Sequence, residues 1–220
     1  MGWISKNEKL EVDNIYHRYL KFPFEIRKYL PLMDTIPNSV QHVDINPYRD
    51  ALIDDLHAEL GLFINHTEVF YTPPNGGELP IHADDVAIDN RAKINITWGP
   101  PEGTVRWWKS DNAKAITDLE SAKEMLGTEL QPDDDFSQRE HANLLAKKED
   151  CELIWEANTN EVSLLNVGQL HSTYNPHPTE GRWTLCFVPG SLAIRGGAYL
   201  TFEEACEVYK DYIIGDDNGN

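Results

Sequence analysis

The sequence predicts a mainly β fold, with a jelly-roll or barrel-like core and helices on its flanks. Three observations carry this prediction. From residue 64 onward, apolar and polar residues alternate in short runs, which is the period of half-buried strands. Turn residues such as Gly, Pro and Asn separate these runs. Helical patterns lie mainly near the two ends of the chain, so the strands form one block that helices can cover.

Residues 1–63 are expected to form a helical N-terminal support. Three amphipathic segments indicate it: 8–20, 24–30 and 48–63. Pro23 separates the first two segments, and Pro31 follows the second. In the third, Leu52, Leu56 and Leu60 recur at helical spacing, and Gly61 ends the pattern.

The β core is expected to span residues 64–190. Its strand candidates are HTEVFYT (66–72), IHADDVAI (81–88), AKINITWG (92–99), TVRWWK (104–109), CELIWEA (151–157), EVSLLNV (161–167), LHSTYN (170–175) and RWTLCFV (182–188). Residues 110–150 break this rhythm, because they are polar and helical in pattern only at 113–126. We interpret this segment as an insertion that is either a lid or a decoration.

The segment 191–213 is expected to contain the C-terminal helix. Thr201 and Glu204 have the spacing of a capping box in front of the apolar pattern that follows. The tail at 214–220 is polar and rich in Gly, Asp and Asn, so we expect it to be disordered. Residues 1–220 are then a single domain.

Composition narrows the classes of partner. The net charge of -18 and the pI near 4.7 argue against nucleic acid or an anionic membrane as the main partner. No apolar run is long enough to span a bilayer, and the N-terminus has no secretory pattern. The three cysteines have no metal-type spacing, as in reduced cytosolic proteins. We therefore expect a cytoplasmic protein, with no prediction of its oligomeric state.

A histidine and an acid occur one residue apart four times in the chain. These pairs are His42/Asp44, His57/Glu59, His66/Glu68 and His82/Asp84. Two such side chains share a direction on a strand but not on a helix, which excludes the pair at 57 and 59 as metal ligands. His42 is expected in a loop or cap, and His66 in a strand that serves the core. His82 and Asp84 follow a Gly/Pro turn at a strand opening and are the favoured pair.

A further histidine and an arginine lie in the last two strand candidates. His171 opens one strand, and Arg182 opens the next after the turn NPHPTEG. In an antiparallel pair joined this way, the two residues would be near each other. Alternation puts Arg182, Thr184 and Cys186 on one face. A buried arginine needs a partner, and a carboxylate ligand is a natural one. His177 in the turn is the alternative to His171.

Two histidines, one carboxylate and the later arginine together resemble the Fe(II)/2-oxoglutarate-dependent dioxygenase superfamily, over roughly residues 64–190. The likeness is to small bacterial or phage-type members and, distantly, to prolyl 4-hydroxylases. Two positions depart from those hydroxylases, which tend to have tyrosine where Leu79 stands and lysine where Arg182 stands. The resemblance implies a double-stranded β-helix (jelly-roll, cupin-like) fold.

The resemblance also implies roles for individual residues. His82, Asp84 and His171 would bind Fe(II), and Arg182 with Thr184 would hold the distal carboxylate of 2-oxoglutarate. Tyr71 and Asn95 are further candidates for contact with 2-oxoglutarate. Succinate and CO2 would be released as the substrate is oxidised, with ascorbate as a candidate reductant. The presence of Asp84, where related halogenases have a small residue, favours hydroxylation.

Two other functions remain open from the sequence. One is a cupin-like metalloenzyme of another class, such as an isomerase or a dioxygenase that does not use 2-oxoglutarate, which has no need of Arg182. The other is a non-catalytic jelly-roll binding module. For the oxygenase, we expect a small molecule or a peptide or protein side chain as substrate, and the sequence does not specify which.

Overall fold

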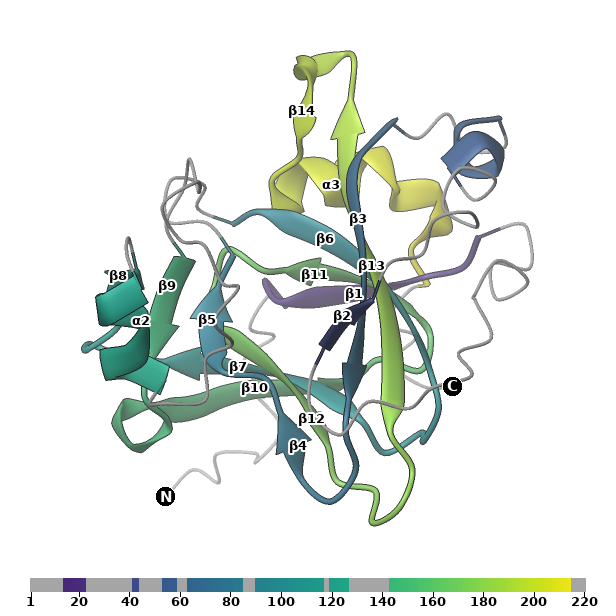
Figure 1. The fold of residues 1–220 in the computed structure, drawn as a ribbon. Coiled ribbons are helices and arrows are strands. Elements are labelled where there is room, and N and C mark those ends of the chain that lie inside the picture. The colour runs from purple at the N-terminus through teal and green to yellow at the C-terminus, as the bar shows by residue number, and fades with distance from the viewer. Residues whose placement is uncertain are drawn as a thin grey trace, which may run out of the picture.

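The fold comes from a computed structural model that describes residues 14–22, 41–43, 53–58, 63–84, 90–116, 119–126 and 143–214. Within these ranges the chain is mainly β. Two antiparallel sheets form a sandwich with a few short helices (Figure 1). No helix in the described ranges has the length and apolar character needed to cross a membrane.

Sheet A contains the strands that lie nearest the C-terminal helix. Its order is β1 (His17–Leu20), β11 (Val162–Asn166), β6 (Ala92–Trp98), β13 (Arg182–Ser191), β3 (Phe63–Thr72) and β2 (Gln41–Val43), with β14 (Ile194–Tyr199) paired to β13. Strand β13 is the centre of the sheet, since it pairs along most of its length with β3 and on its other side with β6.

Sheet B faces sheet A. Its order is β10 (Glu152–Asn158), β7 (Thr104–Lys109), β12 (His171–Asn175), β5 (Ile81–Ala83), β9 (Asn143–Ala146) and β8 (Lys114–Ile116), with β4 (Gly77–Glu78) paired to β12. The described helices are residues 53–58, α2 (Leu119–Leu126), the 3-10 turns η3 (Lys148–Asp150) and η4 (Lys210–Tyr212), and α3 (Phe202–Val208).

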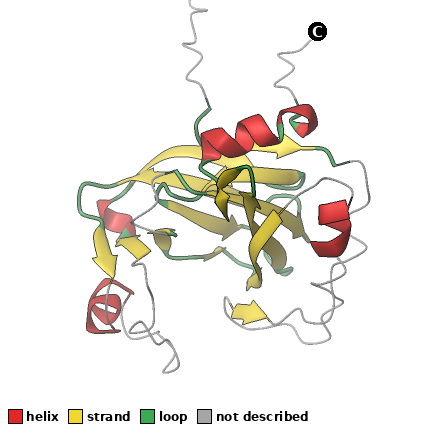
Figure 2. Cartoon of the chain, turned by 90° about the horizontal axis from the view of Figure 1, so that it is seen from above, coloured by secondary structure: helices red, strands yellow, loops and turns green. Residues whose placement is uncertain are grey.

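Among the described residues, the largest apolar cluster lies on the outer face of sheet A. Helix α3 lies across this face (Figure 2). Alternate residues of β6 and β13 point into it, including Ile94, Ile96, Leu185 and Phe187. Helix α3 adds Phe202 and Ala205, and its N-terminus has the expected capping box at Thr201 and Glu204. Burial of this face by the helix leaves the other face of sheet A turned toward sheet B.

The space between the sheets contains an apolar cluster at one end and a row of polar residues on β6. Val105, Trp107 and Leu165 belong to a small cluster that fills the apolar end. The polar part receives Lys93, Asn95 and Thr97 from β6, because these residues alternate with the isoleucines that face the core. A run of buried polar residues inside a sandwich requires hydrogen-bonding partners, which makes this region the place to look for a site.

Three sequence expectations differ from the observed elements. Residues 17–20, expected in a helix, form β1, because pairing with β11 outweighs local helix propensity. The segment 191–213 contains β14 before the helix, since the chain folds back on β13. The insertion at 110–150 extends sheet B: β9 pairs with β5 and β8 pairs with β9. The expected helix at 24–30 and the tail at 215–220 lie outside the described residues.

Candidate metal centre

The structure brings together His82, Asp84 and His171. Strands β5 and β12 pair with His82 directly opposite His171, and the two imidazole centroids are 4.5 Å apart. Asp84 follows β5, and its backbone N–H donates to the Val167 carbonyl at 3.0 Å. One possible ligand atom from each of the three residues lies within 4.8 Å of the other two. A single ion therefore has all three side chains within reach.

Both histidines direct the same ring nitrogen, Nε2, toward the position that a shared ion would occupy. Nδ1 of His82 lies 2.8 Å from the Pro80 carbonyl oxygen, and Nδ1 of His171 lies 3.0 Å from the Gln169 carbonyl oxygen. A carbonyl only accepts hydrogen bonds, so Nδ1 carries the proton in each ring. This leaves the Nε2 lone pair free for a metal, which is the arrangement that orients ligating histidines in proteins.

The distance between two of the acceptors matches a shared cation. Nε2 of His82 lies 3.2 Å from Oδ1 of Asp84. Two ligands bound at about 2.1 Å and at right angles to each other would be roughly 3.0 Å apart. In the neutral ring with Nδ1 protonated, the Nε2 lone pair and the carboxylate oxygen face each other at this distance, and a bound cation would stabilise that contact. The donor set fits a divalent transition metal.

The charges of the two buried ligands suit metal binding. Burial by itself raises the pKa of Asp84, but the nearby Lys93 ammonium outweighs it and holds the pKa well below its usual value. Burial, followed by the proximity of His82, lowers the pKa of His171 to about 3. Asp84 is therefore an anion and His171 a neutral imidazole at neutral pH, which are the forms that bind metal.

Arg182 is the second unusual group between the sheets. It is 4% exposed, and Nη2 donates to Thr97 Oγ1 at 2.9 Å and to Thr159 Oγ1 at 2.6 Å. Its Nε is buried without a hydrogen bond, and no carboxylate pairs with it within the described ranges. Burial lowers the pKa of Arg182 to about 10. A buried guanidinium with an unused donor and neutral partners is suited to an anionic ligand.

The loop before β7 makes room for this arginine. A Cβ added to Gly103 would lie 2.0 Å from Nη1 and 2.4 Å from Cδ of Arg182. Glycine at position 103 therefore lets the backbone pack directly against the guanidinium.

The other predicted cosubstrate residues divide between the two faces of sheet A. Asn95 and Thr184 alternate with core residues and face the space between the sheets, where Asn95 Oδ1 is buried without a hydrogen bond among the described residues. Tyr71 pairs in register with Trp183, and its ring packs 4.8 Å from the Trp183 ring. It therefore lies on the opposite face from Arg182, and the structure does not bring it to the other residues.

The relation of His171 to Arg182 also differs from the expectation. Strands β12 and β13 are consecutive in the chain but belong to different sheets, so they do not form a hydrogen-bonded pair. The turn between them crosses from one sheet to the other, and Asn175 Nδ2 donates to the Glu180 carbonyl at 2.9 Å across it. The two residues reach the same space from facing sheets.

Within the described residues, His57 and His177 are not part of the group of three ligands. His177 stays in the turn, where its Nδ1 accepts from the backbone N–H of Glu180 at 2.9 Å. His57 lies exposed in the helical segment 53–58, as its spacing predicted. His42 is in β2 instead of the expected loop, while Asp44 and Glu59 lie outside the described residues.

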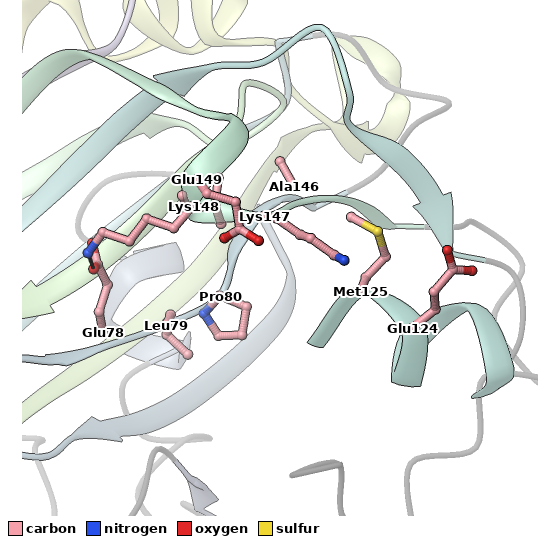
Figure 3. A pocket seen from close by; sticks show the side chains of 10 residues that line it. Glu78, Leu79, Pro80, Glu124, Met125, Ala146, Lys147, Lys148 and Glu149 are labelled. Carbon is pink, nitrogen blue, oxygen red and sulfur yellow. Dashed lines mark hydrogen bonds and ion pairs between the residues drawn. The ribbon is translucent and has the colours of Figure 1, made fainter. Parts of the chain in front are cut away.

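A separate hollow of about 500 Å3 borders β5 on its other side (Figure 3). Ile81 lines it and packs in the outer cluster with Trp108, so the neighbouring His82 points away from it. Its wall includes Glu78, which accepts from Lys148 at 2.5 Å and from Ser172 at 2.9 Å. This hollow is therefore distinct from the space that holds the three ligands.

Sequence reasoning did not find Lys93 beside the ligands, and it considered Glu68 only in the pair with His66, in a strand expected to serve the core. Lys93 Nζ lies 2.6 Å from Asp84 Oδ2 and 3.3 Å from Glu68 Oε2. The signal was present in KINIT of β6, where Lys93, Asn95 and Thr97 form a polar row between isoleucines. A lysine in that row would have to be paired, and pairing could have been sought.

Comparisons with known proteins give no functional assignment. No family model matches the chain, and no curated protein matches it. A crystal structure of PirA is similar at 10% identity, over 56% of this chain and 94% of that chain, with a TM-score of 0.29. The expected membership of the Fe(II)/2-oxoglutarate-dependent dioxygenase superfamily was wrong by these findings, since no model of that or any other family matches the chain.

Proposed function

We propose that this chain is a metal-dependent oxygenase that binds Fe(II) at His82, Asp84 and His171 and uses 2-oxoglutarate as cosubstrate. The observation that carries the proposal is the pairing of two features in one space. Two imidazoles and a carboxylate converge within 4.8 Å, and a buried arginine without a carboxylate partner among the described residues faces the same space.

The donor set favours iron among the common metals. Two histidines and one carboxylate on one side of an ion leave further positions open, which is the arrangement of non-heme Fe(II) oxygenases. A structural zinc site would more often have four protein ligands, and none of the three cysteines, which are free thiols, belongs to the group of three ligands. The open positions favour a reactive centre over a structural one.

The arginine favours a dicarboxylate as the second component. Lys93, beside Asp84, and Thr97, beside Arg182, are four residues apart on β6, or about 13 Å along the strand at 3.3 Å per residue. An ion, a short dicarboxylic acid and a guanidinium placed in a row would need a span of about this length. Arg182 would bind the far carboxylate through Nε and Nη, and Asn95 and Thr184 lie on the same face to contact the chain of the acid.

The protein's own part in such a reaction is to hold and orient. Pro80 and Gln169 keep both Nε2 atoms aimed at the ion, and burial excludes water from the arginine. When bound, Fe(II) supplies the redox chemistry by which 2-oxoglutarate, O2 and a substrate C–H become succinate, CO2 and a C–OH group. Within the mainly β sandwich, this arrangement agrees with a double-stranded β-helix, which we include in the proposal.

We further propose a cytoplasmic enzyme that acts on a small molecule or a peptide or protein side chain. The acidic surface, with a net charge of -18, disfavours nucleic acid as the substrate.

The test is turnover of 2-oxoglutarate by the purified chain. Under argon, Fe(II) and 2-oxoglutarate are expected to produce a visible charge-transfer band, and admission of O2 is expected to yield succinate. His171→Ala should abolish both signals. His57→Ala is the matched control, because it removes an exposed helical histidine, and it should leave both unchanged.

Two results would count against the proposal. Fe(II) bound in stoichiometric amount without any effect of 2-oxoglutarate would favour a metalloenzyme of another class. Absence of stoichiometric metal binding by the folded protein would favour a non-catalytic module.

A further inference from the structure

The carboxylate of Asp84 is divided between two partners. Oδ1 lies 3.2 Å from His82 Nε2, on the side of the proposed ion. Oδ2 lies 2.6 Å from Lys93 Nζ, and Lys93 approaches from β6 in the facing sheet. Both side chains are largely buried, at 10% exposure for Asp84 and 14% for Lys93. The carboxylate is thus fixed from the side opposite the metal ligands.

Lys93 is itself fixed by a second anion. Its Nζ lies 3.3 Å from Glu68 Oε2, from β3. Glu68 Oε2 also accepts from the Cys186 thiol, 3.5 Å away on the neighbouring strand. Three strands of sheet A therefore hold the ammonium in place. The Asp84 backbone is anchored to Val167, so neither partner of the Lys93–Asp84 pair is free to follow the other.

We propose that Lys93 is a positioning residue that holds Asp84 as a one-oxygen ligand and so keeps three coordination positions of the ion open. This inference rests on the proposed function. An octahedral ion with two histidine nitrogens and one carboxylate oxygen has three positions left. A 2-oxo acid that chelates through two oxygens occupies two of them, and O2 needs the third.

Rotation of Asp84 into a two-oxygen mode would remove one of these positions. Such a rotation takes Oδ2 away from Lys93 and leaves a buried ammonium with only Glu68, which is unfavourable. Without Lys93 this ion pair no longer opposes the rotation, and the second oxygen can bind the ion. The expected result is a metal that is still bound but has fewer sites for other ligands.

The experiment counts water ligands on Mn(II), a probe that needs no turnover. The folded full chain is loaded with Mn(II), and the broadening of its electron paramagnetic resonance lines in 17O-enriched water reports bound waters. We expect about three waters for the wild type and about two for Lys93→Met, by the octahedral count. Affinity of the Mn(II)-loaded protein for 2-oxoglutarate should fall at least roughly tenfold in Lys93→Met, since a chelate then displaces Asp84.

Lys114→Met is the matched control. It also breaks a lysine–carboxylate pair, with Glu124 at 3.4 Å, but both side chains are more than half exposed and lie in the insertion. It should keep the wild-type water count and affinity. Lys93→Gln is the second variant if Lys93→Met does not fold. Its amide still donates to Oδ2 weakly, so its water count should fall between the two.

The outcomes separate the two proposals. If the wild type binds no stoichiometric Mn(II), the metal centre itself fails and the role of Lys93 fails with it. If the wild type binds Mn(II) and the folded Lys93 variants keep both the water count and the affinity for 2-oxoglutarate, the metal centre stands and Lys93 is only a structural ion-pair partner.

Discussion

The two faces of sheet A are built from the same strands, but one face has apolar side chains and the other has polar ones. Ile94, Ile96 and Phe187 face α3 in an apolar core, where each side chain is at most 2% exposed. Their neighbours Asn95, Thr97 and Cys186 face sheet B and are buried to a similar extent. Burial is therefore equal on the two faces, and only the chemistry of the side chains differs.

The difference separates stability from function. Apolar burial on the outer face stabilises the fold at roughly 25 cal/mol per Å2. The face toward sheet B contains Arg182 Nε and Asn95 Oδ1, which are buried without hydrogen bonds among the described residues. Such groups oppose folding by about 1–3 kcal/mol each. A face that lowers stability in this way is consistent with selection for a ligand.

The largest expected effect on stability comes from breaking the apolar face. Phe187→Ala should lower the free energy of unfolding by about 3–5 kcal/mol, because it leaves a cavity in the core. Cys186→Ala, one residue away on the other face, should change it far less. Urea unfolding of the two variants measures the difference. Equal losses of unfolding free energy in the two variants would mean that both faces contribute equally to stability, which would contradict the difference described above.

On the polar face, a substitution should have the opposite result: it should lower ligand affinity without lowering stability. Arg182→Met is expected to leave the stability unchanged or raise it, since it removes a buried charge without a carboxylate partner. Affinity of the metal-loaded protein for 2-oxoglutarate should fall by about 2–5 kcal/mol in titration calorimetry, the cost of removing one partner of a buried charge pair.

Arg106→Met is the matched control for this variant. Arg106 lies on the outer side of sheet B, where Nε donates to Glu156 at 2.8 Å and the guanidinium stacks 3.5 Å over the Tyr174 ring. Its loss should reduce stability without changing the affinity for 2-oxoglutarate. If the two arginine variants behave alike, Arg182 has no special role.

A smaller effect is expected at Asn95. Asn95→Leu keeps the size of the side chain and removes the Oδ1 acceptor that has no hydrogen bond. Stability should rise by on the order of 1 kcal/mol. The affinity for 2-oxoglutarate should fall if Asn95 contacts it. Thermal unfolding and calorimetry on one preparation give both values, and a loss of stability would indicate that Asn95 has a structural partner.

The smallest effect should come from the helix that covers the apolar face. Thr201→Ala removes the capping box of α3 and should lower the free energy of unfolding by about 1 kcal/mol. Metal affinity should stay at the wild-type value, because α3 lies across the outer face of sheet A. A change in metal affinity would show that the two faces are coupled.

Local patterns predicted the elements where burial and period agreed. Alternation and capping are properties of neighbouring residues, so local sequence predicted the strands around Tyr71, Ile94 and Leu185 and the cap of α3. Strand β1 was missed because its partner β11 is about 145 residues away along the chain. The prediction that β12 and β13 pair failed for a related reason, since nothing local indicates that a turn crosses between sheets.

The candidate site was predicted in part for the same reason. Spacing placed His82 and Asp84 on one side of a strand, and the structure brings His171 and Arg182 to the same space. Tyr71 was assigned by the flanking strand alone, and register puts it on the other face. Lys93 and Glu68 could not be assigned, because their role depends on which strands face each other.

The sequence by itself determined which residues alternate between the two faces of each strand, and hence that a polar row runs through β6 and β13. Only the tertiary structure decided that Lys93 meets Asp84 and that Arg182 has threonines instead of a carboxylate beside it. The physical reason is that side-chain direction follows from the two-residue period of a strand. Contact between sheets depends on strand order and register, which are set by the packing of the whole chain.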